Sequence, residues 1–357
     1  MTAVMELAGR LAGSHDLSQE ELAGLIRLRS RESAEFLKEQ AAAQCRRYYH
    51  GKVFLRGLIE ISSICRNDCL YCGIRKSNQA ADRYRLDKEQ ILLCCRRGHA
   101  LGYRTFVLQG GEDPWFNDDR MTDIVSAIRR EFPDCAITLS LGERSRESYQ
   151  RLFDAGADRY LLRHETASES HYHYLHPASM SFQNRMECLR HLRETGYQTG
   201  CGFMVGSPGQ TAEHLARDLR FIKQFEPHMV GIGPFLSHKD TPFASQPGGS
   251  VELTLYLLSI IRLLLPRVLL PATTALGTAS ADGREEGLRC GANVVMPNLS
   301  PPDVREKYNL YDNKLCTGAE AAESLAVLKK RIGEAGFLVS MERGDSLIQT
   351  TAGNNMN

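Results

Sequence analysis

Three closely spaced cysteines, Cys65, Cys69 and Cys72, form a C-x3-C-x2-C pattern directly after an apolar, strand-like run. The segment is short enough for the three sulfurs to converge on one iron–sulfur cube, and an ordinary [4Fe–4S] cluster takes four protein ligands. One iron would therefore remain open to bind another molecule. The alternatives are zinc, which usually takes two ligand pairs in structural sites, and three unrelated thiols. No second ligand pair is evident, which favours the cluster.

Polar residues and glycines recur at the ends of short apolar runs farther along the chain. They lie at 109–113, 140–143, 163–166, 206–209, 233–238, 273–274 and 297–298. If the apolar runs are parallel strands of a barrel, these residues meet at one rim, because the active site of such a barrel lies at the carboxyl ends of its strands. The pattern therefore predicts a site that also includes the cysteines.

The elements that must position these residues follow from a unit that recurs after residue 52: helix, glycine, apolar strand and polar loop. The predicted strands are 53–61, 105–109, 136–141, 159–163, 198–204, 229–233, 268–272 and 292–296, and helices fill the gaps at 118–131, 182–195, 211–225, 251–265 and 283–290. Eight parallel strands over roughly 250 residues predict an α/β fold with a complete (β/α)8 barrel of the TIM type. An open doubly wound sheet is the competitor, but its glycine fingerprint is missing after the first strand.

Two additions flank the predicted barrel, which we place at 51–300. The first fifty residues are expected to form a helical extension, with a capping box at 18–21 and a helix at 30–49. Residues 301–357 are expected to form a C-terminal loop, a helix at about 319–332 and a polar tail. Cys316 stands alone in that region, so a second cluster near the C-terminus is not expected.

Charge and composition exclude several classes of protein. The formal charge of +1 provides no electrostatic footprint for nucleic acid or an anionic membrane. The apolar run at 253–265 is too short and too polar for a membrane span, and no secretory signal is expected at the N-terminus. Eleven scattered cysteines do not resemble a secreted disulfide framework. We therefore expect a cytoplasmic protein that binds neither nucleic acid nor a membrane.

The cysteine motif, with Tyr71 before its last cysteine, resembles the signature of the radical S-adenosylmethionine (SAM) enzymes. The segment Gly110-Gly111-Glu112 resembles the element of that family that holds the methionine amino group of SAM. The resemblance implies a [4Fe–4S] cluster with three cysteine ligands, whose open iron binds the amino and carboxylate groups of SAM. It also implies reductive cleavage of SAM to a 5′-deoxyadenosyl radical.

Within that superfamily, the chain resembles the HydE maturases of [FeFe]-hydrogenase. The resemblance runs from about residue 55 to residue 311 and is carried by 108–114, 139–143, 159–166, 204–211, 231–235, 271–275 and 289–293. It implies that Glu165 and Arg185 help to hold SAM, with Thr138 and Met204 near it. It further implies that an inner cavity is lined by Arg163, Thr273, Thr274, Tyr308 and Tyr311. Arg185 could instead be a solvent-facing helix residue, and the tyrosines could be lid contacts.

The HydE resemblance also implies a function and partners. The substrate would be a small organometallic species, a cysteine-bound Fe(CO)2(CN) unit whose sulfur is attacked by the deoxyadenosyl radical during assembly of the diiron subunit of the H-cluster. The implied partners are the other hydrogenase maturases, a radical SAM tyrosine lyase and a GTPase scaffold, together with a reductant protein.

Three rival functions remain open at this point. A biotin-synthase-like sulfur inserter needs an internal sacrificial cluster with cysteine ligands on several strands, and the run 105–109 contains no cysteine. A methylornithine synthase would act on lysine and is harder to exclude. A non-catalytic iron–sulfur scaffold would produce no deoxyadenosine. The loop residues His238 and Asp240 are weak candidates for polar contacts, and we assign them no role.

Overall fold

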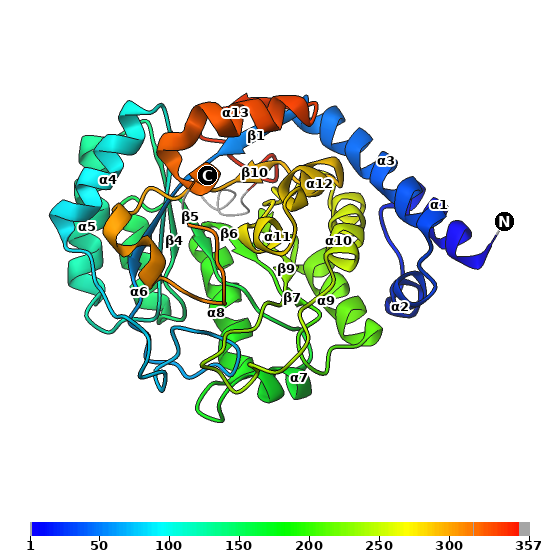
Figure 1. Ribbon diagram of the computed structural model, residues 1–357, viewed down its shortest axis with the longest axis horizontal. Helices are drawn as coiled ribbons and strands as arrows, with labels where there is room; N and C mark the ends of the chain where they lie inside the picture. The colour runs from blue at the N-terminus through cyan, green and yellow to red at the C-terminus, as the bar shows by residue number, and fades with distance from the viewer. Residues whose placement is uncertain (1, 317, 350–357) are drawn as a thin grey trace, which may run out of the picture.

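A parallel sheet forms the centre of the molecule, with helices arranged around it (Figure 1). The computed structural model describes residues 2–316 and 318–349. Six strands pair in the order β2-β3-β4-β5-β6-β8, and all of their pairings are parallel. Their bounds are β2 (Gly57–Ser62), β3 (Thr105–Gly110), β4 (Ala136–Ser140), β5 (Arg159–Leu161), β6 (Gln198–Cys201) and β8 (Met229–Val230). The expected α/β fold with parallel strands is therefore confirmed.

The remaining strands are short and lie in two smaller sheets. A three-stranded sheet has the order β10-β1-β11, with β1 (Lys52–Leu55), β10 (Val294–Val295) and β11 (Leu338–Ser340). A second sheet pairs β7 (Met204–Val205) with β9 (Gly233–Pro234). The strand predicted at 268–272 is present only as isolated parallel bridges from Leu269 to Met229 and from Pro271 to Val294.

Three predicted strands, 53–61, 198–204 and 229–233, are each divided into two. The break between β1 and β2 falls at Arg56, where the chain changes partners from β10 and β11 to β3. The break between β6 and β7 falls at Gly202, which has φ +156°. A Cβ atom at Gly202 would lie 1.9 Å from the carbonyl oxygen of Gly231, so these two backbone segments approach too closely there for any side chain at Gly202.

The helices between the strands agree with their predicted bounds within one residue where a range was predicted. They are α5 (Asp118–Glu131), α8 (Phe182–Thr195), α9 (Ala212–Phe225), α10 (Val251–Leu264) and α12 (Gly283–Arg289), joined by α4 (Lys88–Ala100), α6 (Arg146–Asp154), α7 (Glu169–Leu175) and α11 (Thr274–Ala279). In α5, the Asn117 side chain caps the first turn by accepting a hydrogen bond from the Arg120 N–H, and Met121, Ile124 and Ile128 form the buried stripe. None of the described helices has the length and hydrophobicity needed to cross a membrane.

The N-terminal extension consists of α1 (Ala3–Ser14), α2 (Gln19–Arg27) and α3 (Arg31–Tyr49). The capping box predicted at 18–21 is present, since Ser18 and Glu21 exchange side-chain and backbone hydrogen bonds. Helix α2 packs against α9, and α3 packs against α10, so the extension covers one side of the helical layer (Figure 1).

The C-terminal region differs from the prediction. The helix expected at 319–332 is α13 (Leu325–Glu334), because the residues before it form two short 3-10 turns. The segment expected to be a polar tail contains β11, which pairs with β1, and Asp345 accepts a hydrogen bond of 2.6 Å from the buried Arg159. This part of the expectation was wrong, because pairing with a distant strand orders a segment whose own sequence is too short to indicate a strand. The rest of the predicted tail, 350–357, lies outside the described residues.

Candidate active site

A cavity of about 280 Å³ opens among the loops that follow the strands. Of the sixteen residues predicted for the site, all except Thr138 and Thr274 line it. The lining includes Cys65, Cys69, Tyr71, Cys72, Gly110, Gly111, Glu112, Arg163, Glu165, Arg185, Met204, Thr273, Tyr308 and Tyr311. Segments more than 240 residues apart in the sequence therefore meet in one chamber, which we call the inner cavity.

The cysteine loop is held in place mainly by Arg83. Its guanidinium donates hydrogen bonds to the backbone carbonyl oxygens of Ser63 (2.6 Å), Ile74 (2.8 Å), Arg75 (2.7 Å) and Asn78 (3.1 Å). Each of these is a charge-assisted bond, which is stronger than a neutral one. One cation thus fixes both ends of a loop that contains no helix or strand of its own.

Gly111 allows the Gly-Gly-Glu segment to lie directly against the cysteine loop. A Cβ atom at Gly111 would lie 2.3 Å from the carbonyl oxygen of Ile64 and 2.9 Å from the Cβ of Cys65. The backbone N–H of Arg66 also donates to the carbonyl oxygen of Glu112 at 3.0 Å. The glycine is therefore required for the close approach of the two predicted motifs.

The three sulfurs are not gathered closely enough to bind a single ion as they stand. Thiolates on one tetrahedral zinc lie about 3.8 Å apart, as Zn–S bonds of about 2.3 Å require. In the described part of the chain, the three sulfurs do not all lie within 4.8 Å of one another. Burial raises the pKa of the Cys65 thiol and raises the pKa of Cys72 to about 12, with a further contribution from Cys65. A bound cationic cluster would offset that cost.

Glu112 is held at its carboxylate by two groups. Arg66 Nε donates to Glu112 Oε2 at 3.0 Å, and the backbone N–H of Glu143 donates to Oε1 at 3.1 Å. Its side chain is 10% exposed. The carboxylate therefore has a fixed orientation in the wall of the inner cavity.

Glu165 and Arg163 bring charge to the cavity that internal hydrogen bonds do not satisfy. Nη2 of Arg163 lies 3.1 Å from Oε2 of Glu165, but neither atom makes a directional hydrogen bond, and both are buried. Glu165 also has φ +65°, a left-handed conformation that costs a non-glycine residue about 1–3 kcal/mol. Both residues line the inner cavity, so their ion pair contributes charge to its wall.

Arg185 is buried, so it is not a solvent-facing helix residue. Its Nε donates to Glu143 Oε1 at 2.6 Å, and its Nη1 donates to the carbonyl oxygen of Arg163 at 2.6 Å. Burial acts against its charge, but Tyr172 and Glu143 raise the pKa of Arg185 above its usual value. Arg185 thus links the loops after β4 and β5 from its place on α8.

Tyr308 and Tyr311 line the inner cavity and belong to the segment that follows β10. Gln109 Nε2 donates to the Tyr308 hydroxyl at 3.4 Å, and the Lys314 ammonium lies 5.2 Å from the centre of the Tyr308 ring. Burial raises the pKa of both tyrosines, so their hydroxyls stay protonated at neutral pH. They can therefore donate hydrogen bonds to a bound ligand.

The three predicted threonines are placed differently. Thr273 lines the cavity and donates to the carbonyl oxygen of Ile232 at 3.3 Å. The Thr274 hydroxyl lies outside the lining and accepts a hydrogen bond of 3.0 Å from Nη2 of Arg284. Thr138 is fully buried in β4, and its hydroxyl makes no hydrogen bond to the described residues.

Several residues that shape the site received no role in the sequence analysis. Met180 lines the cavity, where its Sδ lies 3.7 Å from the Sγ of Cys69. His238, left without a role, is buried behind the cysteine loop, against Gly73. Arg66 lies inside the cysteine motif itself, and this position in the sequence indicates that it is near the site.

A family model described as the radical SAM superfamily matches residues 59–222. The chain is 44% identical over 317 residues to the [FeFe] hydrogenase maturase subunit HydE of Thermotoga maritima. These residues cover 89% of this chain and 90% of that relative. The chain belongs to the HydE family of radical SAM enzymes. Membership in this family implies that the cofactors are a [4Fe–4S] cluster and SAM.

The HydE family has relatives with a different activity. The chain is 30% identical over 301 residues to the 3-methylornithine synthase of Methanosarcina acetivorans, with 84% of each chain covered. The crystal structure of a methylornithine synthase (PylB) superposes with a TM-score of 0.81 at 27% identity, covering 94% of this chain and 97% of that chain. Membership in the HydE family and this shared fold confirm the predicted radical SAM enzyme.

Proposed function

We propose that this protein is a maturase that acts in assembly of the diiron subunit of the [FeFe]-hydrogenase H-cluster. The observation that carries the proposal is the 44% identity to a HydE protein over nearly the whole of both chains. The inner cavity supports it, because it combines three free cysteines with charged groups able to hold SAM and a second ligand.

Cys65, Cys69 and Cys72 would hold the cluster, and Glu112, Glu165 and Arg185 would hold SAM, with Tyr71, Gly110, Gly111, Thr138 and Met204 around it. The cluster and SAM, once bound, supply a 5′-deoxyadenosyl radical. The meeting of the three cysteines in the wall of one cavity, the charged pair of Arg163 and Glu165 in the same wall, and the buried Thr138 hydroxyl without a hydrogen bond support this assignment. The chain's part is to orient these groups and to exclude water from the cavity.

Arg163, Thr273, Thr274, Tyr308 and Tyr311 would hold the organometallic substrate, a cysteine-bound Fe(CO)2(CN) unit, with its sulfur toward the radical. A guanidinium and hydroxyl groups can bind the cysteine carboxylate through charge-assisted and neutral hydrogen bonds. Thr274 would at most support its neighbour Thr273, because its own hydroxyl is bonded to Arg284 outside the lining of the cavity. The proposed partners are the other maturases, a radical SAM tyrosine lyase and a GTPase scaffold, and a reductant protein.

We also propose that the parallel sheet continues into a complete barrel. Isolated parallel bridges join Met229 to Leu269, Pro271 to Val294 and Leu58 to Asn298, on the side where the six-stranded sheet is open. A closed barrel would seal the inner cavity on all sides but its mouth, which suits an air-sensitive substrate. The division into segments at residues 50 and 300, and a cytoplasmic location, remain predictions.

Methylornithine synthesis is the second candidate, because the PylB structure shares the fold over nearly the whole chain. To separate the two, we would reconstitute the cluster without oxygen, reduce it in the presence of SAM, and offer the iron–cysteine complex, free cysteine or lysine. The proposed function predicts reductive cleavage of SAM with the iron–cysteine complex, measured as methionine release above background, together with an adenosyl product joined through C5′ to the substrate sulfur. Turnover with lysine alone would favour the synthase, and no cleavage of SAM under any condition would refute a radical enzyme.

A further inference from the structure

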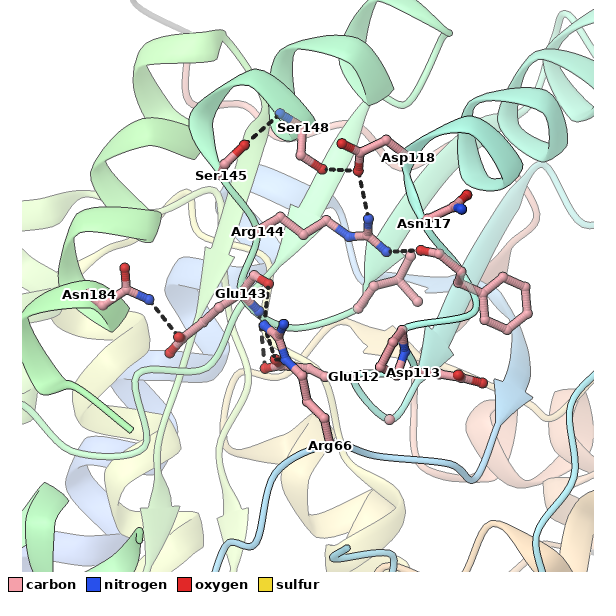
Figure 2. Close-up of a pocket in the computed structure, with 14 residues that line it drawn as sticks. Arg66, Glu112, Asp113, Asn117, Asp118, Glu143, Arg144, Ser145, Ser148 and Asn184 are labelled. Carbon is pink, nitrogen blue, oxygen red and sulfur yellow. Dashed lines mark hydrogen bonds and ion pairs between the residues drawn. The ribbon is translucent and has the colours of Figure 1, made fainter. Parts of the chain in front are cut away.

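A second cavity, of about 540 Å³, lies on the outer side of the loops after β3 and β4 (Figure 2). Its lining includes Arg66, Glu112, Glu143, Arg144 and Asn184. We call it the outer cavity. Gly111 and Glu112 belong to the walls of both the outer and the inner cavity, so Glu112 separates the two.

Arg66 approaches Glu112 from the outer cavity. Its side chain is 56% exposed, and among the described residues it belongs to the lining of the outer cavity and not of the inner one. Nε and Nη2 of Arg66 lie 3.0 and 2.9 Å from Glu112 Oε2. Figure 2 shows the guanidinium directed at Glu112 and Glu143 together.

Glu143 completes the hold on Glu112. Its backbone N–H donates to Glu112 Oε1 at 3.1 Å, and its carbonyl oxygen accepts from Arg66 Nη2 at 3.3 Å. The Glu143 side chain accepts hydrogen bonds of 2.6 Å from both Asn184 and Arg185. The N–H that holds Glu112 is thus fixed by α8, and both oxygens of Glu112 are engaged by donors that lie on the outer cavity.

We propose that Arg66 is a positioning residue that holds the Glu112 carboxylate from the outer cavity, so that it receives a ligand's ammonium group from the inner cavity. This inference rests on the proposed function, in which that ligand is SAM and the ammonium is its amino group. Arg66 is more than half exposed, so water screens its repulsion of a second cation. Removing Arg66 leaves Oε2 of Glu112 without its donor and frees the Glu112 side chain to rotate. This loss of orientation outweighs the relief of the repulsion between Arg66 and the ligand's ammonium group.

The test is the binding of SAM, and of an analogue of SAM that lacks the amino group, to anaerobically reconstituted protein without reductant. Arg66→Ala is expected to weaken SAM binding about tenfold, as for loss of one charge-assisted hydrogen bond, and to change binding of the analogue less than about twofold. Arg66→Lys keeps the charge but replaces the planar guanidinium, which places Nε and Nη2 on Glu112, with a single nitrogen, so its loss should be intermediate. Arg146→Ala, at an exposed arginine paired with Glu194, is the matched control and should bind both ligands normally.

Arg66→Ala should also have no further effect on SAM binding in a Glu112→Gln background, because its effect passes through the Glu112 carboxylate. Iron content and cluster absorbance show whether each variant retains its cluster. Unchanged SAM affinity in Arg66→Ala, or equal losses for SAM and the analogue with the cluster intact, would overturn the inference while leaving the proposed function standing. A wild-type protein that binds no SAM would overturn the proposed function and this inference with it.

Discussion

The Tyr71 hydroxyl donates a hydrogen bond of 3.0 Å to Nε2 of His176. Nδ1 of His176 lies 2.9 Å from the carbonyl oxygen of Tyr172. A carbonyl oxygen can only accept, so Nδ1 carries the imidazole proton and Nε2 is free to accept from Tyr71. Burial, with a smaller contribution from the nearby Arg185, lowers the pKa of His176 to about 3. A neutral histidine outside the predicted motifs therefore fixes an aromatic residue of the cysteine motif.

The neutral state of His176 predicts a pH dependence of stability. The His176 side chain binds a proton near pH 6.5 in the unfolded chain and only near pH 3 in the folded chain. The contribution of the neutral side chain to the free energy of unfolding is therefore complete above pH 6.5 and is lost as the pH falls toward 3. In His176→Gln, the fall in the free energy of unfolding between pH 6.5 and 5.5 should shrink by about 1 kcal/mol. Anaerobic urea unfolding at the two pH values measures it.

The matched control for this prediction is His173→Gln, at an exposed histidine on α7, the helix that ends directly before His176. It should leave the pH dependence as it is in the wild type. Equal slopes for wild type and His176→Gln would show that His176 is not held neutral by the fold.

The three cysteines of the motif should be required for the cluster, and other buried cysteines should not. Cys65→Ser, Cys69→Ser and Cys72→Ser are each expected to lose most of the roughly four irons that the reconstituted wild type should contain, since thiolates are the ligands of such clusters. Cys290→Ser, at a buried cysteine in a different part of the molecule, should retain them. Iron analysis and visible absorbance give the result, and a cluster that persists in Cys69→Ser would refute the ligand assignment.

Gly111→Ala should separate the two motifs of the site. The new methyl group would lie 2.3 Å from the Ile64 carbonyl oxygen, so the Gly-Gly-Glu segment or the cysteine loop must move. We expect at least about a tenfold loss of SAM affinity, because the Glu112 carboxylate shifts with the segment. Gly333→Ala in α13, where a Cβ atom meets nothing within 4 Å, is the control. Normal SAM binding by Gly111→Ala would contradict the close approach of the motifs.

The buried pair of Lys314 and Glu60 should anchor the C-terminal loop that carries Tyr308 and Tyr311. Lys314 Nζ lies 2.7 Å from Glu60 Oε1, and the Glu60 side chain is 1% exposed. Lys314→Met leaves that carboxylate unpaired, which should cost about 3–5 kcal/mol of unfolding free energy, and adding Glu60→Gln should recover part of it. Lys330→Met, in an exposed ion pair, should change stability by less than about 1 kcal/mol. Denaturant midpoints test this, and a stable Lys314→Met protein would argue against a buried charge pair.

The sequence was sufficient for the elements whose signals are local. The helix at 118–131 matches its prediction because its cap and its buried stripe lie within one segment. The left-handed glycines that end the repeated helices, Gly102, Gly156, Gly196 and Gly291, were predicted for the same reason, and all have positive φ. The family could be recognised because its two motifs are each contiguous, at 65–72 and 110–112.

What could not be predicted depends on pairing between distant segments. The strand at Leu338–Ser340 exists because β1 offers it hydrogen bonds, and its three residues have no distinctive pattern. The run 268–272 is apolar but forms only single bridges. In the site, Arg83, Met180 and His176 belong to no motif, because their roles come from backbone carbonyls, sulfurs and hydroxyls that only the fold brings near them.

The most direct test of the central claim is activation of an apo-[FeFe]-hydrogenase, measured as hydrogen evolution, in a mixture of the other maturases, SAM, a reductant and this protein. We predict that hydrogen evolution requires the wild-type protein and is lost when Cys69→Ser replaces it. Equal hydrogen evolution with and without the wild-type protein would contradict its assignment as a maturase.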